Sequence, residues 1–378
     1  IIWSFLLFVL ITGCSNHSLK NDVSNTTDSV ESKYSMPADA FPVQFNGRHI
    51  FVRAVMNDSI EINLLLDTGA QQPVFDSSFI AKNNDQLGIE TKPTHAIIES
   101  PSGLINITHR ITGSVKLKAF TGNEEFSGAL MIANIKKLNL GADAIFPAYL
   151  FFENKIVMID LKNQYIRILS QDTVNELKSQ YICFPLKGTQ YTYFSIPAKI
   201  FIDKVPNLPV NINGDLQIDL GAPGFLYLFM RHKVVNTAFT PSIKSIKIKT
   251  LAFNMTDTVY SAAIVSDQLR LSDTLSFRNA RISLLNQFIN VDTAQIGILG
   301  NEFLRKFSVI LDYRNKQFYL KSNPEYYLPC RNSNLGMRLS KIPDKDSYTV
   351  TSLYEGTPTS IAGIQIGDEI LSINDIPT

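Results

Sequence analysis

Two aspartates stand at matching places in the two halves of this 378-residue chain. Asp67 ends the apolar run of the segment LLLDTGA, and Asp219 ends that of LQIDLGA, 152 residues later (219 − 67). A carboxylate at the end of an apolar strand needs a partner or several hydrogen bonds, because burying a lone charge is costly. Two carboxyl groups held close together share one proton, so one serves as general base and the other as general acid. The pair therefore indicates hydrolysis by an activated water molecule.

The residues that follow each aspartate suit such a pair. Gly69 and Gly221 let the backbone approach closely and offer N–H groups to the carboxylates, which a bulkier residue would obstruct. We therefore expect Asp67 and Asp219 to be the catalytic residues. The predicted active-site loops consist of Thr68, Gly69, Ala70, Leu220, Gly221 and Ala222.

A second pair of motifs repeats the same shift. Asp160 in KIVMIDLKNQYIRI and Asp312 in FSVILDYRNKQFYL are also 152 residues apart (312 − 160), and Asn163 and Asn315 fall in register. Two motifs at one shift indicate an internal duplication. Because Asp is favoured in turns, where it caps backbone amides, we expect Asp160 and Asp312 to have structural roles.

Short β-rich runs must position the two aspartates. Examples are FVRAV at 51–55 and IEINLLL at 60–66, and Asn, Asp, Gly and Pro punctuate such runs at intervals typical of all-β folds. Long amphipathic helices are not expected, and only the segments near 171–180 and 301–307 are predicted to form helices of two or three turns. Packing of two equivalent β lobes about a pseudo-twofold axis would bring the two carboxyl groups together.

Composition and cysteine usage exclude several classes of protein. The formal net charge is +1 and only 18% of residues are charged, so the chain has no electrostatic footprint for nucleic acid. The three cysteines form no C-x-x-C and the five histidines form no metal-binding pair, so we expect no metal and no cofactor. Whether Cys183 and Cys330 pair is left open, although isolated cysteines in a long chain are more often separate.

The first residues differ from the rest of the chain. Ten of the thirteen residues in 1–13 are large and apolar, which suits a signal-peptide core, and the run closes with Ile-Thr-Gly-Cys at Cys14. This resembles the lipobox of bacterial lipoproteins. The resemblance implies lipidation at Cys14 and a lipid-anchored location on the periplasmic side of a bacterial membrane. The alternative is an apolar N-terminus with an unrelated cysteine.

The chain is expected to divide into five segments. Residues after Cys14 are rich in Ser, Asn and Thr and poor in large apolar residues, which is typical of a flexible tether. From about residue 334 the sequence belongs to neither half of the duplication. In chain order the predicted segments are a lipoprotein signal (1–14), a tether (15–36), an N-terminal lobe (37–175), a C-terminal lobe (176–328) and a further module (329–378).

The duplicated motif resembles that of retropepsin-like aspartic peptidases. Asp67-Thr68-Gly69-Ala70 follows a Leu run, and the segment IGILGN at 296–301 is similar to the apolar-apolar-Gly segment that packs behind the aspartate in that family. The similarity covers about 45–325. It implies an all-β, bilobal pepsin/retropepsin-like fold, an Asp67/Asp219 dyad acting on polypeptide substrates, and activity as a monomer, because one chain supplies both aspartates.

The same resemblance implies a mobile hairpin over the cleft. The candidate flap is the predicted turn at Pro101, Ser102 and Gly103, and an ordinary surface turn is the alternative. The sequence departs from the family at Leu220, where a Thr or Ser usually bonds the opposite loop; Thr68 keeps that hydroxyl. The competing interpretation is therefore a catalytically inactive peptide-binding or scaffold lipoprotein.

Two further departures concern acidity and packing. Ala70 and Ala222 stand where related enzymes often carry a hydroxyl that stabilises the ionised carboxylate, so we expect a less depressed dyad pKa and activity at weakly acidic or neutral pH. In the first half, IFPA at 145–148 replaces the apolar-apolar-Gly segment.

The C-terminal segment resembles a bacterial PDZ domain. The similarity rests on NLGM at 334–337 and on the run from EGTP at 355–358 to GDEIL at 367–371. In that family the first motif holds the C-terminal carboxylate of a peptide that adds as a strand to the sheet edge. The implied carboxylate loop is Leu335, Gly336 and Met337. Because the sequence stops at Thr378, we expect the domain to be partial.

Overall fold

The computed structural model describes residues 36–100, 103–138, 140–188, 193–205, 208–239, 246–251, 258–285, 294–328, 330, 336–341, 347–373 and 376–377. Several predictions fall outside these residues. They are the signal segment with Cys14, nearly all of the tether, the flap residues Pro101 and Ser102, and Leu335 of the carboxylate loop. Within the described part the chain is mostly β, as the sequence predicts.

A six-stranded sheet lies where the two copies of the second motif meet. Strands β12 (Ile156–Asp160) and β22 (Phe307–Asp312) pair antiparallel at its centre. Met158 lies opposite Ile310, its counterpart at the shift of 152, so the pairing is centred on the axis that relates the two copies. The outer strands are β13 (Tyr165–Leu169) and β1 (Ala40–Pro42) beside β12, and β23 (Gln317–Ser322) and β14 (Ile182–Pro185) beside β22.

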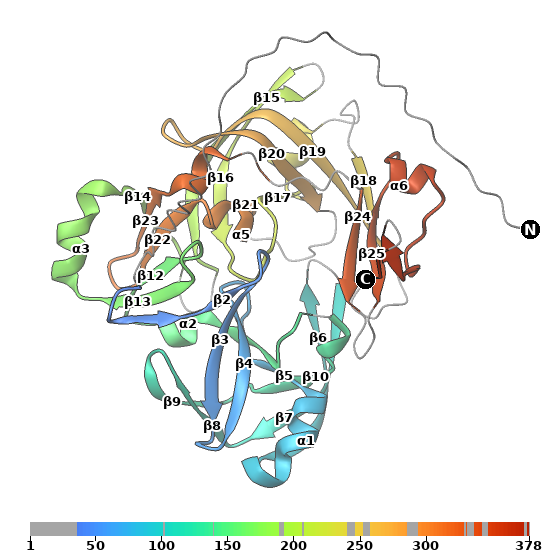
Figure 1. Cartoon of the computed structure of the whole chain (residues 1–378). Coiled ribbons are helices and arrows are strands. Elements are labelled where there is room, and N and C mark those ends of the chain that lie inside the picture. The colour runs from blue at the N-terminus through green and yellow to red at the C-terminus, as the bar shows by residue number, and fades with distance from the viewer. Residues whose placement is uncertain are drawn as a thin grey trace, which may run out of the picture. The chain divides into compact units, whose positions relative to one another are not determined.

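A ten-stranded sheet holds the first aspartate, in blue to green in Figure 1. Its path runs β6 (Glu90–Ser100), β7 (Gly103–Thr112), β10 (Met131–Ala133), β5 (Val74–Asp76), β11 (Ala144–Pro147), β4 (Ile60–Asp67), β3 (Ile50–Met56), β8 (Ser114–Ala119) and β9 (Gly122–Ser127), with β2 (Gln44–Phe45) beside β3.

A second ten-stranded sheet holds the other aspartate. Its path runs β15 (Ser195–Val205), β16 (Leu208–Ile218), β21 (Gln295–Leu299), β17 (Leu226–Phe229), β20 (Ser276–Leu285), β19 (Thr258–Arg270), β18 (Ile246–Leu251), β25 (Tyr348–Tyr354) and β24 (Met337–Lys341), with β26 (Glu369–Ile370) beside β25.

The two large sheets repeat one pairing pattern around the aspartates. Strand β4 pairs parallel with β11, and β11 pairs antiparallel with β5. Strand β16 pairs parallel with β21 in the same way, and β21 pairs antiparallel with β17. Segment 145–148, which lacks the apolar-apolar-Gly pattern, therefore occupies the place that 298–301 occupies in the second sheet. The domain boundaries themselves stay predictions.

The helices agree only in part with the sequence predictions. Helix α3 (Gln171–Leu177) and the 3-10 turn after it (Lys178–Gln180) form where expected, whereas α5 (Asn301–Leu304) is one turn long because β22 already begins at Phe307. Helix α1 (Ser77–Leu87), of 11 residues, was not predicted. Asp76 caps its first amides and Gly88, at φ +62°, ends it in the left-handed conformation. Two short helices, α2 (Ala148–Phe152) and α4 (Lys233–Ala238), were also not predicted.

Aromatic side chains fill the space behind each aspartate strand. In the first half the rings of Phe146 and Phe151 lie 4.9 Å apart, and in the second half Phe225 and Phe277 lie 5.0 Å apart. All four side chains are buried. Burial of each such side chain contributes about 1.5–3 kcal/mol, so these clusters fix the strands that end at the dyad.

The C-terminal segment continues the second large sheet. Strand β25 pairs with β18 on one side and with β24 on the other, and β24 ends the sheet path. A short helix and a two-stranded hairpin complete the described part of this segment: α6 (Pro358–Ile361), β27 (Ser372–Ile373) and β28 (Ile376–Pro377).

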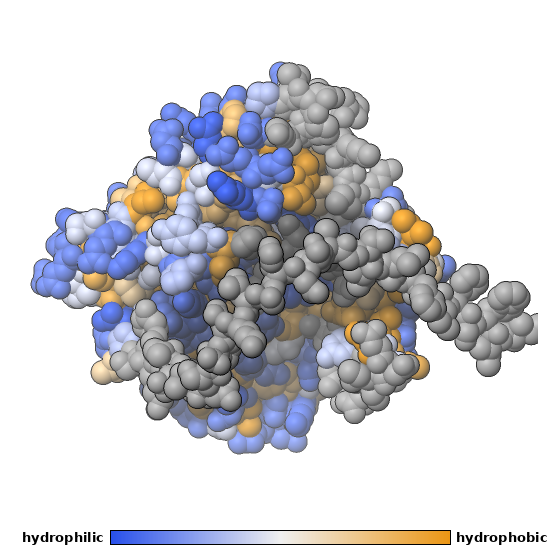
Figure 2. Space-filling model, turned by 45° about the horizontal axis from the view of Figure 1, so that its top comes forward, coloured by the Kyte–Doolittle hydropathy of each residue, from blue (hydrophilic) through white to orange (hydrophobic). Residues whose placement is uncertain are grey.

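In the space-filling view, hydrophilic residues dominate the visible described surface and apolar residues form scattered small groups (Figure 2). Among the described residues, no helix has both the length and the hydropathy needed to cross a lipid bilayer.

Candidate active site

The structure brings the carboxyl groups of Asp67 and Asp219 together across the two large sheets. A Cβ placed on Gly221 would lie within 3.0 Å of Asp67 Cγ and of both its carboxyl oxygens, and one placed on Gly69 would lie 2.6 Å from Asp219 Oδ2. Each carboxyl group thus packs on the glycine of the opposite loop, and the two side chains hydrogen-bond to one another. Only glycine permits this approach on either side.

Backbone amides hold both carboxyl groups in place. The N–H groups of Gly69 and Ala70 donate to Asp67 Oδ1 at 2.6 and 3.0 Å. The N–H of Gly221 donates to Asp219 Oδ1 at 2.8 Å. Each loop therefore orients its own aspartate with backbone N–H groups, as the sequence predicts, while its glycine receives the aspartate of the other loop.

Thr68 joins the two loops. Its hydroxyl donates to the carbonyl of Ile218 at 2.7 Å and accepts from the N–H of Leu220 at 2.9 Å. The side chain is buried, so neither bond competes with water. Leu220 occupies the matching position in the second loop, where its buried side chain joins the apolar core and offers no hydroxyl to the first loop.

Asn301 gives the second loop a support that the first loop lacks. Its side-chain amide donates to the carbonyl of Leu220 at 2.6 Å and to the carbonyl of Arg48 at 2.8 Å. The equivalent residue at the start of the helix in the first half is Ala148. The sequence analysis names Asn301 within a motif and gives it no role. The signal in the sequence is an asparagine directly after the apolar-apolar-Gly segment.

Burial raises the pKa of both aspartates above the ordinary value for Asp. For Asp67, the donors at Gly69 and Ala70 partly offset the effect of burial on the pKa. For Asp219, burial and then the adjacent charge of Asp67 raise the pKa well above its usual range. Two carboxyl groups in contact ionise one after the other, so the pair holds a single proton over an interval of pH.

Two aromatic residues that the sequence did not reveal lie beside the dyad loops. His49 is buried, its ring interacts with the carbonyl of Gly221, and burial followed by the charge of Arg48 lowers its pKa to about 4. The imidazole is therefore neutral above that pH. Partial burial raises the pKa of Tyr193, and the charges of Asp219 and Asp67 lie close enough to its phenol to raise that pKa further.

The predicted hairpin forms at the expected place. Strands β6 and β7 pair along their length up to Ser100 opposite Gly103, and the tip at Pro101 and Ser102 lies outside the described residues. Ile97, near the tip on β6, is 62% exposed. The same arrangement recurs in the second large sheet, where β18 and β19 form the corresponding hairpin.

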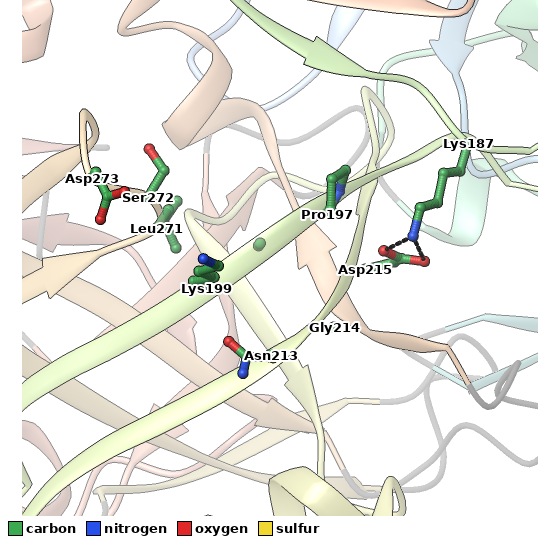
Figure 3. Close-up of a pocket in the computed structure, with 10 residues that line it drawn as sticks. Lys187, Pro197, Lys199, Asn213, Gly214, Asp215, Leu271, Ser272 and Asp273 are labelled. Carbon is green, nitrogen blue, oxygen red and sulfur yellow. Dashed lines mark hydrogen bonds and ion pairs between the residues drawn. The ribbon is translucent and has the colours of Figure 1, made fainter.

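One described cavity, of about 660 Å³, lies along the hairpin β15–β16. Figure 3 shows Lys187 reaching Asp215, and its Nζ lies 2.7 and 3.0 Å from the two carboxyl oxygens. None of the dyad-loop residues lines this cavity. Its Lys–Asp pair is already satisfied, so the cavity is not the site of the acid–base chemistry.

Asp160 and Asp312 cap turns, which confirms their structural roles. In both copies Oδ1 accepts from the backbone N–H three residues later at 2.9 Å, and Oδ2 accepts from the side chain of the same asparagine. The two turns are equivalent in geometry, as the shared shift predicts.

Metal and disulfide chemistry find no support among the described residues. Within that part of the chain no three His, Cys, Asp or Glu side chains converge as metal ligands. Cys183 is exposed, Cys330 is buried, and both are free thiols.

The candidate carboxylate loop is described only in part. Gly336 takes a φ of +74°, and its carbonyl accepts from the N–H of Tyr354 at 2.8 Å. Met337 begins β24, which ends the described sheet. A peptide adding beside β24 would therefore extend the described sheet by one strand.

Comparisons with known proteins add no family to this geometry. No protein-family model matches the sequence, and the search of curated proteins gives no match.

Proposed function

We propose that this chain is an aspartic endopeptidase with a bilobal, pepsin/retropepsin-like fold. The observation that carries the proposal is the reciprocal packing at the dyad, where each carboxyl group lies on the glycine of the opposite loop. Two aspartates that each formed a structural ion pair with a cation would not need such symmetry. Neither aspartate has a cationic partner among the described residues.

Hydrolysis would use the single proton that the pair shares. The ionised carboxyl accepts a proton from a water molecule bound between the two groups, while the protonated one donates to the peptide carbonyl oxygen. The water oxygen attacks the carbonyl carbon and gives a gem-diol. The proton taken from water then passes to the leaving nitrogen, the C–N bond breaks, and a gem-diol hydroxyl returns a proton to the second carboxyl, which restores the pair. The amides of Gly69, Ala70 and Gly221 keep both carboxyl groups oriented. This mechanism uses neither a metal nor a covalent intermediate.

The substrate is an extended polypeptide. The hairpin β6–β7 is the flap in this proposal, and exposed Ile97 near its tip offers an apolar contact to a peptide below it. The C-terminal segment would bind a peptide C-terminus through Gly336 and Met337, beside β24, the last strand of the described sheet path. The protein would act as a lipid-anchored monomer on the periplasmic side of a bacterial membrane.

A second candidate function is a catalytically inactive peptide-binding lipoprotein. Leu220 favours it, because the second loop lacks the hydroxyl that Thr68 supplies to the first. The bonds from Asn301 to the backbone of Leu220 and Arg48 weigh against it, since they hold that loop by another route.

The test is cleavage of a diverse peptide mixture by the full chain at pH 4–7 in ¹⁸O-labelled water, with products identified by mass spectrometry. We expect new C-termini that carry one ¹⁸O, and none with Asp67→Asn. The matched control is Asp160→Asn, which alters a turn and leaves cleavage unchanged. Absence of cleavage by the folded parent protein at every pH would favour the binding function.

A further inference from the structure

A small cavity beside the second dyad loop gathers arginines. It measures about 240 Å³, and Gly224, five residues after Asp219, forms part of its wall. Arg48, Arg281 and Arg338 line it together with Tyr354. Its volume is below the about 300–1,000 Å³ that holds a drug-sized molecule, so a single small group fits it.

The three arginines come from different parts of the fold. Arg48 precedes β3, Arg281 lies on β20, and Arg338 lies on β24 of the C-terminal segment. Arg281 Nη1 and Arg338 Nε both contact the phenol oxygen of Tyr354, at 2.7 and 3.2 Å. The guanidinium of Arg281 also lies 4.6 Å from the centre of that ring. Tyr354 thus brings two cations side by side.

The cavity carries an excess of positive charge. Four of the described residues that line it are arginines, and one of these, Arg305, pairs with Glu325. One carboxylate, Glu302, lines the same cavity. Burial would raise the pKa of Tyr354, yet the charges of Arg338 and Arg281 outweigh it and leave that pKa below the usual value. Burial and then the charge of Arg338 lower the pKa of Arg48, whereas Tyr354, Tyr227 and Glu302 outweigh burial and raise the pKa of Arg338. An added anion would therefore relieve the repulsion at Arg48.

We propose that this cavity binds one oxyanion, a carboxylate or a phosphate group, held by the guanidinium groups of Arg48, Arg281 and Arg338. Guanidinium groups present planar pairs of N–H donors that match the oxygens of both anions. This site differs from the described part of the peptide-carboxylate loop, because neither Gly336 nor Met337 lines the cavity.

An anion in this cavity would connect the C-terminal segment to the catalytic loop. The N–H of Gly224 donates to the phenol of Tyr227 at 2.7 Å, and its carbonyl accepts from the N–H of Glu302 at 3.2 Å. The cavity wall is thus continuous, through the backbone, with the loop that carries Asp219. Binding is independent of hydrolysis and is measurable in the Asp67→Asn variant.

The test measures the unfolding temperature of the full chain, and its affinity for phosphate and for acetate by titration calorimetry. Both anions are added as sodium salts, and sodium chloride keeps the ionic strength constant. We expect saturable binding of at least one anion and a rise in unfolding temperature. Arg338→Gln and Arg48→Gln should each weaken binding at least tenfold. Arg53→Gln, an exposed arginine on β3, is the matched control and should leave binding unchanged.

The anions distinguish the sources of the group. Tighter binding of phosphate identifies a phosphoryl group, and tighter binding of acetate identifies a carboxylate. In the second case, comparing peptides with a free and with an amidated C-terminus tests whether the carboxylate is that of a peptide. Stabilisation by chloride equal to that by both anions would overturn the proposal. Equal weakening by Arg53→Gln would overturn it too. If Arg338→Gln does not fold, Arg281→Lys, which keeps the charge and loses the planar fork, should still weaken binding.

Discussion

The two dyad loops reach the same geometry by different means. The first loop contains Thr68, whose hydroxyl makes two buried bonds to the second loop. The second loop contains Leu220, which makes apolar contacts instead, and Asn301 holds its backbone from behind. The carboxyl groups nevertheless keep reciprocal contacts with Gly69 and Gly221. The pairing of the carboxyl groups therefore depends on the glycines, whereas other contacts can replace the hydroxyl contacts around them.

The largest expected effect comes from the carboxyl groups themselves, where the two loops should behave alike. Asp67→Asn and Asp219→Asn should each lower kcat/KM by about 10³-fold or more, and the double variant should be no worse than either, because the groups act as a unit. Steady-state kinetics on a cleaved peptide measures this. A variant with a tenfold loss or less would show that its aspartate is not part of the catalytic pair.

The glycines should come next and should again be equivalent. Gly221→Ala places a methyl group on the carboxyl of Asp67, and Gly69→Ala places one on that of Asp219. We expect kcat to fall about 10²-fold in each, because a shift near 1 Å in a catalytic group has effects of that size.

The control for the glycines is Gly88→Ala, at the end of α1. Nothing lies within 4 Å of a Cβ there, although φ is +62°. This change should lower stability by about 1 kcal/mol and leave kcat unchanged. Unaltered kcat in Gly221→Ala would contradict the reciprocal packing.

The hydroxyl position should separate the two loops. Thr68→Val removes a buried donor and acceptor and leaves the carbonyl of Ile218 and the amide of Leu220 without that partner, so we expect a loss of about 1–3 kcal/mol in the free energy of unfolding. Leu220→Thr removes buried apolar contacts and should not raise activity. Urea denaturation and kinetics test both. If Leu220→Thr increases kcat/KM severalfold, the missing hydroxyl limits catalysis.

The pH dependence of stability should show the smallest effect and should be larger for the second aspartate. A raised pKa means that the folded protein holds the proton more tightly than the unfolded chain, so stability is full below the unfolded pKa and falls as pH rises through the folded one. Asp219→Asn removes this loss. It should stabilise the protein at pH 7 by about 1 kcal/mol.

Denaturant unfolding at pH 3.5 and pH 7 gives the comparison. The gain from Asp219→Asn should disappear at the lower pH, where the carboxyl already carries its proton. An equal gain at both values would show that ionisation of Asp219 is not what limits stability at neutral pH.

The sequence reveals the parts of the site that repeat and misses those that do not. Asp67, Asp219 and the turn aspartates were predictable, because a duplication leaves the same types at the same shift. His49, Tyr193 and Asn301 were not, since they have no counterpart of the same type 152 or 153 residues away and reach the loops only through tertiary contacts.

The helices show the same limit on another scale. Helix α1 carried local signals, the cap at Asp76 and the glycine at Gly88, but its polar middle hid the apolar periodicity. Helix α5 was predicted too long because Leu304 and Phe307 share apolar character, and only the sheet pairing of β22 decides where the helix ends.

In this mechanism Asp67 and Asp219 share one proton. ¹³C NMR of the full chain labelled at the aspartate carboxyl carbons and titrated from pH 3 to pH 8 tests this sharing, with Asp67→Asn and Asp219→Asn used for assignment. We predict two separate titrations, with one carboxyl group still protonated after the other has ionised, and a single titration in each variant. Two independent titrations, both near the ordinary value of about 3.9 for Asp, would show that the two carboxyl groups do not share a proton.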